Sequence, residues 1–133
     1  MDPRNQPYVT TENLNHITEQ IIGFAITIHR TLGPGLLEPT YAAALRIELE
    51  GARIEYQQEV RVPALYKGHL IGEYRIDFII EDLVIVDVKS VERMPPVFDA
   101  QMLTYLRVTE KRVGLLIIFN SRLVTEGVKR FSL

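Results

Sequence analysis

The sequence contains no cysteine, and none of its apolar runs approaches the length of a membrane span. Without cysteine the chain cannot form disulfides, thiolate metal sites or a thiol nucleophile. The polar N-terminus lacks the apolar core of a signal peptide, so we expect a cytoplasmic protein without a membrane partner. The 133 residues suffice for one hydrophobic core but not for two. We therefore expect one domain over residues 10–133, preceded by a flexible segment at residues 1–9.

Excess charge of one sign is also absent, since 15 Lys and Arg oppose 17 Asp and Glu for a net charge of -2. This balance argues against a protein that coats nucleic acid through a broad basic surface. With 47% hydrophobic and 24% charged residues, the composition is typical of a soluble globular protein and excludes intrinsic disorder. A nucleic-acid enzyme that works through a local site remains compatible with it.

Three segments have the apolar periodicity of helices. Apolar residues recur every three or four positions from Leu14 to Leu32, and Thr10 or Thr11 can cap this helix. Gly33-Pro34-Gly35 ends it and predicts a helical hairpin with the next helix. The expected helices cover residues 10–32, about 37–51 and about 100–109.

Extended segments fill most of the remaining chain. Pro63 favours an edge strand or a bulge, because proline cannot donate to a sheet. The expected strands are Ile54–Val60, Arg61–Tyr66, His69–Ile80, Val84–Val91, Val113–Phe119 and Leu123–Phe131. Strands flanked by helices predict an α/β domain with a mixed central sheet covered on both faces.

The most informative segment, residues 72–90, is an expected hairpin with charges among its apolar residues. Side chains alternate along a strand, so we expect one apolar face on its first strand. That face is Tyr74, Ile76, Phe78 and Ile80. A three- or five-residue loop around Asp82 would match it to the apolar face of the second strand.

This register sets Asp77 directly opposite Asp87, and Arg75 opposite Lys89. Like charges in such pairs repel, so something should compensate. A divalent cation between the two aspartates would do so, because carboxylate oxygens are natural ligands of Mg²⁺ and Mn²⁺. Acid, acid and lysine around one ion is an arrangement suited to phosphodiester hydrolysis. The alternative is an exposed sheet face with ordinary solvated charges.

The segment from Ile28 to Tyr41, IHRTLGPGLLEPTY, resembles the signature of the GxxExxY family, with Gly35, Glu38 and Tyr41 at the named positions. The resemblance continues through residues 66–68, 72–77, 86–89 and 100–106. That family is assigned to the PD-(D/E)XK nuclease-like superfamily. The resemblance implies a restriction-endonuclease-like αβββαβ core, here with an N-terminal helical hairpin.

The resemblance also implies roles for individual residues. Asp77 and Asp87 correspond to the metal-binding acids and Lys89 to the catalytic lysine. Val88 would offer its backbone carbonyl to the metal, and Glu38 would bind or steady the metal from the first core helix.

Further positions are expected to support the site. Gln101 and Tyr105, four residues apart on one helical face, are similar to the QxxxY motif of RecB-like nucleases. That motif is thought to position the lysine and nucleic acid. Tyr41 is expected to pack or hydrogen-bond locally, and Arg75 is a candidate contact to the nucleic-acid backbone.

Two departures from the family pattern bear on activity. The family commonly has Glu where Asp87 stands, and the superfamily accepts Asp there. A histidine usually precedes the glutamine by three residues, and this chain has Phe98 instead.

The sequence thus predicts a Mg²⁺- or Mn²⁺-dependent nuclease that hydrolyses DNA, with RNA as second choice. The alternative is an inactive nuclease-fold module that binds nucleic acid or a protein partner. A homodimer is compatible with either function, because a chain this short offers little surface for wrapping DNA.

Overall fold

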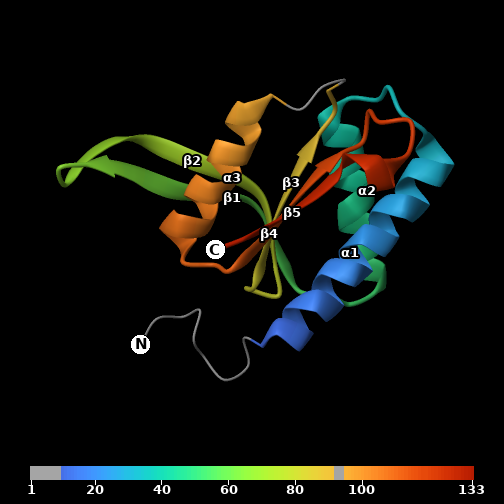
Figure 1. Ribbon diagram of the computed structural model, residues 1–133, viewed down its shortest axis with the longest axis horizontal. Coiled ribbons are helices and arrows are strands. Elements are labelled where there is room, and N and C mark those ends of the chain that lie inside the picture. Colours follow the sequence, from blue (N-terminus) through green and yellow to red (C-terminus); the bar gives the residue numbers. More distant parts are fainter. Residues whose placement is uncertain (1–9, 92–94) are drawn as a thin grey trace.

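The computed structural model describes residues 10–91 and 95–133, and the flexible segment expected at residues 1–9 lies outside this part. Figure 1 shows the arrangement of the elements. The helices are α1 (Thr11–Leu32), α2 (Glu38–Gly51) and α3 (Pro96–Thr109). The strands are β1 (Tyr56–Tyr66), β2 (His69–Ile80), β3 (Val84–Lys89), β4 (Val113–Ile118) and β5 (Val128–Ser132), with a short 3-10 helix, η2, at Val124–Gly127.

The five strands form one mixed sheet in the order β1-β2-β3-β4-β5. Only β3 and β4 are parallel, and α3 connects them. One apolar core lies between the sheet and the hairpin of α1 and α2, and a second lies between the sheet and α3. The order α2-β1-β2-β3-α3-β4 is the αβββαβ core implied by the resemblance, so the predicted fold class is confirmed.

Local sequence explains where the first two helices begin and end. The Thr10 hydroxyl accepts a hydrogen bond from the Asn13 N–H at 3.1 Å and caps α1. Gly33 ends α1 with φ of 71°, which glycine adopts without strain. Pro39 lies in the first turn of α2, where its missing N–H costs nothing. Among the described residues, no helix has the length and apolar character needed to cross a membrane.

Three expected boundaries are wrong by more than two residues. The two segments expected at residues 54–60 and 61–66 form one continuous strand, β1, which lies at the sheet edge as Pro63 predicts. Helix α3 begins at Pro96, earlier than expected, because proline is tolerated in a first turn. The strand expected at residues 123–131 begins only at Val128, since η2 occupies the preceding residues.

The predicted apolar face of β2 is also wrong. Phe78 and Ile80 belong to the core beneath α1 and α2, whereas Tyr74 and Ile76 pack with the core beneath α3. The change of face occurs at Asp77, where the β1–β2 pairing is interrupted between Gln58↔Phe78 and Val60↔Ile76. Strict alternation fails because the backbone is irregular at this point.

Glu59 is the residue of β1 at this interruption, and its φ of 53° lies in the left-handed region. As a result, Asp77 lines a groove beneath α2 instead of facing α3 with Ile79. The backbone irregularity therefore decides which helix Asp77 faces.

The predicted β2–β3 register is confirmed at the closed end of the hairpin. A three-residue turn joins Ile80↔Val84, and the ladder continues to Phe78↔Val86. The pairing stops there, immediately before Asp77 and Asp87. Beyond that point β2 departs from β3 and continues paired with β1 alone, so the expected pair of Arg75 opposite Lys89 does not form.

Candidate active site

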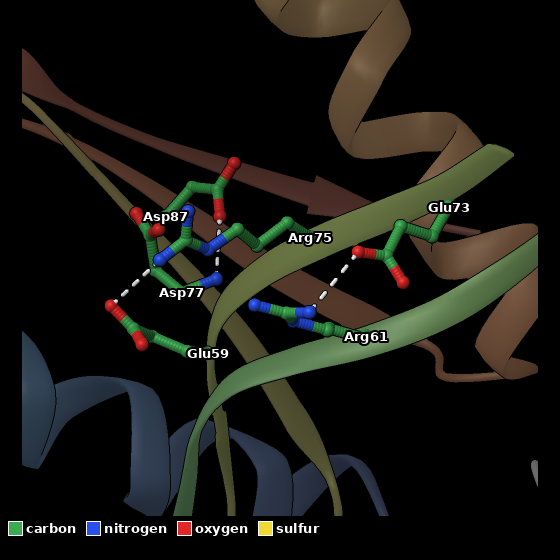
Figure 2. Close-up of polar contacts among 6 residues, drawn as sticks. All are labelled: Glu59, Arg61, Glu73, Arg75, Asp77 and Asp87. Atoms are coloured by element: carbon green, nitrogen blue, oxygen red, sulfur yellow. Dashed lines mark hydrogen bonds and ion pairs between the residues drawn. The ribbon is translucent and has the colours of Figure 1, made fainter.

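Asp77 and Asp87 lie next to each other where β2 and β3 separate. An oxygen of Asp77, Oδ2, accepts a hydrogen bond from the Val88 N–H at 2.8 Å. The Asp77 N–H donates to Oδ1 of Asp87 at 3.3 Å (Figure 2). Each carboxylate thus meets the main chain of the other strand where the ladder has ended. The two side chains are therefore held next to each other by main-chain N–H groups that no longer take part in the ladder.

Burial makes this pair of acids electrostatically costly. The Asp87 side chain is only 3% exposed, and burial together with the nearby Asp77 charge raises its pKa to about 7. Burial also raises the pKa of Asp77, although the Val88 N–H and the Lys89 and Arg75 charges oppose the increase. Strongly shifted carboxyl groups of this kind are common at catalytic sites.

Glu38 approaches the pair from the N-terminal end of α2. Partial burial raises its pKa, the charge of Lys89 lowers it and the charge of Asp77 raises it. Glu38 and Asp77 line a groove of about 530 Å³ between α2 and the β1–β2 ribbon. The structure therefore brings Glu38, Asp77, Asp87 and Lys89 into one electrostatic neighbourhood.

Lys89 lies at the end of β3 and points toward α3. Its ammonium is 4.8 Å from the centre of the Phe98 ring, a distance typical of a cation–π contact. Phe98, three residues before Gln101, therefore supports the lysine through its ring. The sequence did not indicate this contact, because it depends on how α3 packs against β3.

Gln101 and Tyr105 share the lysine's side of the sheet. Both line a pocket with Lys89 and Arg75. Burial raises the pKa of Tyr105 to about 12, the charges of Asp87 and Asp77 raise it as well, and a hydrogen bond with Gln101 lowers it. Tyr105 is 5% exposed and makes an edge contact with the ring of Tyr74. The phenol thus remains protonated beside the acids.

Tyr41 is fully buried and supports the loop before α2. Its hydroxyl donates to the Gly33 carbonyl at 2.6 Å and accepts from the Leu36 N–H at 3.2 Å. Its ring stacks on Phe119 at 4.4 Å. These contacts agree with the expected local packing and connect Tyr41 to the position of Glu38.

Sequence reasoning missed three residues near the acids. Arg46 lines the same groove as Glu38, and its spacing of two helical turns from Glu38 is a signal that could have found it. Glu59 pairs with Arg75 at 3.0 Å across the ribbon. Ser90 donates to the Leu36 carbonyl and ties the end of β3 to the loop before α2. The last two contacts join distant segments and have no local signal.

The donor set fits a hard divalent cation in part. Oδ1 of Asp77 and Oδ2 of Asp87 accept no hydrogen bond within residues 10–91 and 95–133, so each carboxylate retains one oxygen for a ligand. Carboxylate oxygens suit Mg²⁺ and Mn²⁺. Within the same ranges, however, no three acidic or histidine side chains form a complete metal-binding group. Glu38 would have to move closer to become a third ligand.

Comparison with known proteins gives one match. A family model for the PD-(D/E)XK nuclease superfamily matches residues 15–131, which include every candidate site residue named above. Searches of curated proteins and of solved structures found no significant match.

Proposed function

This chain belongs to the PD-(D/E)XK nuclease superfamily, and from that premise we propose that it is a divalent-metal-dependent nuclease. Its substrate is the phosphodiester backbone of DNA, with RNA as the second choice. The observation that carries the proposal is the buried pair of Asp77 and Asp87, held where two strands separate and within electrostatic range of Lys89. The motif of Gly35, Glu38 and Tyr41 supports membership of the GxxExxY family.

Asp77 and Asp87 would hold the cation through their remaining oxygens, with Glu38 and the Val88 carbonyl as further ligands. Mg²⁺ or Mn²⁺, when bound, supplies Lewis-acid activation of water and neutralises charge that develops at phosphorus. It would also offset the burial and the repulsion by Asp77 that together raise the pKa of Asp87. The two carboxylates thus lower the stability of the metal-free protein and would raise the stability of the metal complex.

Lys89 has the charge and the position to act on the substrate. Its ammonium can donate hydrogen bonds to a phosphate oxygen or orient the attacking water. Contact with Phe98 restricts the lysine, which reduces the entropy lost when it meets the phosphate. Gln101 and Tyr105 support the same side of the site, and Arg75 can contact a neighbouring phosphate.

The test is cleavage of single- and double-stranded DNA and RNA with Mg²⁺ or Mn²⁺. We expect the wild type to cleave, and Lys89→Ala and Asp77→Ala to lose activity by about 100-fold or more. Arg130→Gln is the control, because Arg130 lies on β5 at the opposite edge of the sheet from β1. Equal activity in all four proteins would identify a contaminant and disprove the proposal.

A further inference from the structure

On the N-terminal side of Asp77, β2 no longer pairs with β3, and β1 and β2 leave the sheet together as a two-stranded ribbon (Figure 1). One face of the ribbon packs against α3 through Val60, Val62 and Tyr74. The opposite side of the ribbon is exposed to solvent, and its inner end lies at the groove lined by Asp77. A continuous exposed surface therefore leads away from the acids.

Two arginines lie side by side on this exposed face. Arg61 and Arg75 are directly opposite each other in the β1–β2 register. Arg75 pairs with Glu59 at 3.0 Å, and Arg61 pairs with Glu73 at 3.5 Å (Figure 2). The four side chains are 53–66% exposed, so these ion pairs are weak and a phosphate can compete for either guanidinium.

The tip of the ribbon is apolar and lacks acids. Leu65 and Leu70 form a cross-strand pair and are 63% and 71% exposed. Tyr66 and Ile71 beside them are also largely exposed. Residues 60–72 contain Arg61, Lys67 and His69 but no Asp or Glu. An exposed patch that combines apolar side chains with positive charge is typical of a binding surface.

The outer edge of the ribbon is protected against pairing with another strand. Pro63 cannot donate to a neighbour, Glu59 kinks β1, and the register shifts between Ala64 and Leu65. These features disfavour strand addition by a second copy of the chain. The exposed face, and not the edge, is therefore the surface available to a partner.

We infer that this face is an arm that enters the major groove of duplex DNA, with Arg61 and Arg75 on phosphates and the Leu65–Leu70 pair on the groove floor. The inference rests on the proposed nuclease function and specifies its substrate class. A two-stranded β-ribbon fits the major groove of B-form DNA, whereas the corresponding groove of duplex RNA is too narrow. Each arginine is balanced by a glutamate, but the tip around Lys67 has no acidic residue to oppose its positive charge. This basic tip and the continuity of the face with the Asp77 groove both favour DNA over a protein partner.

The length of the ribbon sets the length of DNA that it can contact. The part of β2 that belongs to the ribbon, from His69 to Asp77, is about 26 Å long at about 3.3 Å per residue. This span corresponds to about eight base pairs. Nucleic acid bound along the arm would thus extend to one side of the cleavage position.

The test is fluorescence anisotropy without divalent cation, using duplex DNA, duplex RNA and single-stranded DNA of equal length. We expect duplex DNA to bind tightest. Arg61→Gln should weaken its binding about fivefold and reduce the salt slope by about one. The double variant Leu65→Thr/Leu70→Thr should also weaken binding, because threonine suits a strand but lacks the apolar contact. Arg130→Gln, which removes one exposed arginine from the far sheet edge, should bind like the wild type.

Several results would disprove the proposal that the ribbon binds duplex DNA. One is equal binding by the wild type, Arg61→Gln and the double variant, and another is equal weakening in Arg130→Gln. A third is a wild-type dimer in sedimentation that the double variant dissociates, which would assign the tip to a second copy. Binding and cleavage separate the two proposals. Wild-type protein that binds through the arm but never cleaves would disprove the nuclease, and cleavage unaffected by the arm variants would disprove the arm alone.

Discussion

The centre of the sheet and the β1–β2 ribbon are built from similar strands but have opposite environments. In β3 and β4 almost every side chain is buried, including that of Asp87. In the ribbon one face is exposed, and its charges form weak surface pairs. Strand β2 belongs to both regions, and Asp77 lies at the junction. The site therefore forms where buried acids, whose pKa values are raised, meet a surface that a large substrate can reach.

The comparison also shows where charge is costly. At the centre, burial raises the pKa of Asp87 to about 7, because a carboxylate loses hydration there and faces Asp77. On the ribbon, Glu73 and Arg61 are more than half exposed, so water screens the interaction between their charges. Substitutions in the two regions should thus have effects of different size, and four experiments test this difference.

The largest expected effect is steric. A side chain at Gly114 in β4 would meet the Met102 sulfur at 2.4 Å, whereas nothing lies within 4 Å of one at Gly72 in the ribbon. Gly114→Val should lower the free energy of unfolding by about 3 kcal/mol through overpacking. Gly72→Val should change it by less than about 0.5 kcal/mol. Urea denaturation measures both, and equal destabilisation would show that the ribbon is packed as tightly as the sheet.

Metal binding should stabilise the junction. Mn²⁺ at about 100 times its Kd should raise the free energy of unfolding by about 2.7 kcal/mol, if only the folded state binds it. Asp87→Ala should abolish this gain, and Arg130→Gln should retain it. Calorimetric titration provides the Kd. Absence of binding by the wild type would instead favour the alternative prediction of a catalytically inactive nuclease-fold module.

The pH dependence of stability should reveal the buried acid. Burial and the charge of Asp77 raise the pKa of Asp87 from its ordinary value of 3.8 to about 7 in the folded protein, so the folded state binds more protons between these values. Stability should therefore fall as pH rises through this window, and the cost should be complete above about pH 7.

Asp87→Asn removes this cost. In metal-free protein it should raise the free energy of unfolding at about pH 8 by a few kcal/mol, since each unit of pKa shift corresponds to about 1.4 kcal/mol. The gain should disappear below about pH 3, where the wild-type carboxyl is protonated in both states. Denaturation curves at several pH values would measure it, with Asp82→Asn as the control at an exposed aspartate. A gain in stability that is independent of pH would contradict the raised pKa of the buried Asp87 carboxyl.

The smallest effect is expected on the ribbon. Glu59→Gln removes the Glu59–Arg75 ion pair, both of whose side chains are about 60% exposed. The free energy of unfolding should change by less than about 0.5 kcal/mol. Thermal denaturation at low and high salt measures the change. A loss as large as that of Gly114→Val would mean that this surface pair holds the junction together.

Much of the fold was predictable because its signals are local. The periodicity of α1, its stop at Gly33 and the short turn before β3 depend on neighbouring residues, and all three are present. The adjacency of Asp77 and Asp87 followed from that turn, because a hairpin transmits register directly from its loop. The prediction that Ile76 shares a face with Phe78 was wrong, because the interruption at Glu59 and Asp77 breaks the alternation on which it depended.

The sequence by itself determined the α/β class, the helical hairpin and the adjacency of the two aspartates, since these follow from periodicity, turn chemistry and short-range register. Only the tertiary structure decided that β2 leaves β3 at the acids, that Asp77 faces α2 and that Phe98 contacts Lys89. It also decided that Arg61 and Arg75 form one exposed pair. These features join segments far apart in the chain, and packing of whole helices and strands, not the preferences of neighbouring residues, sets their geometry.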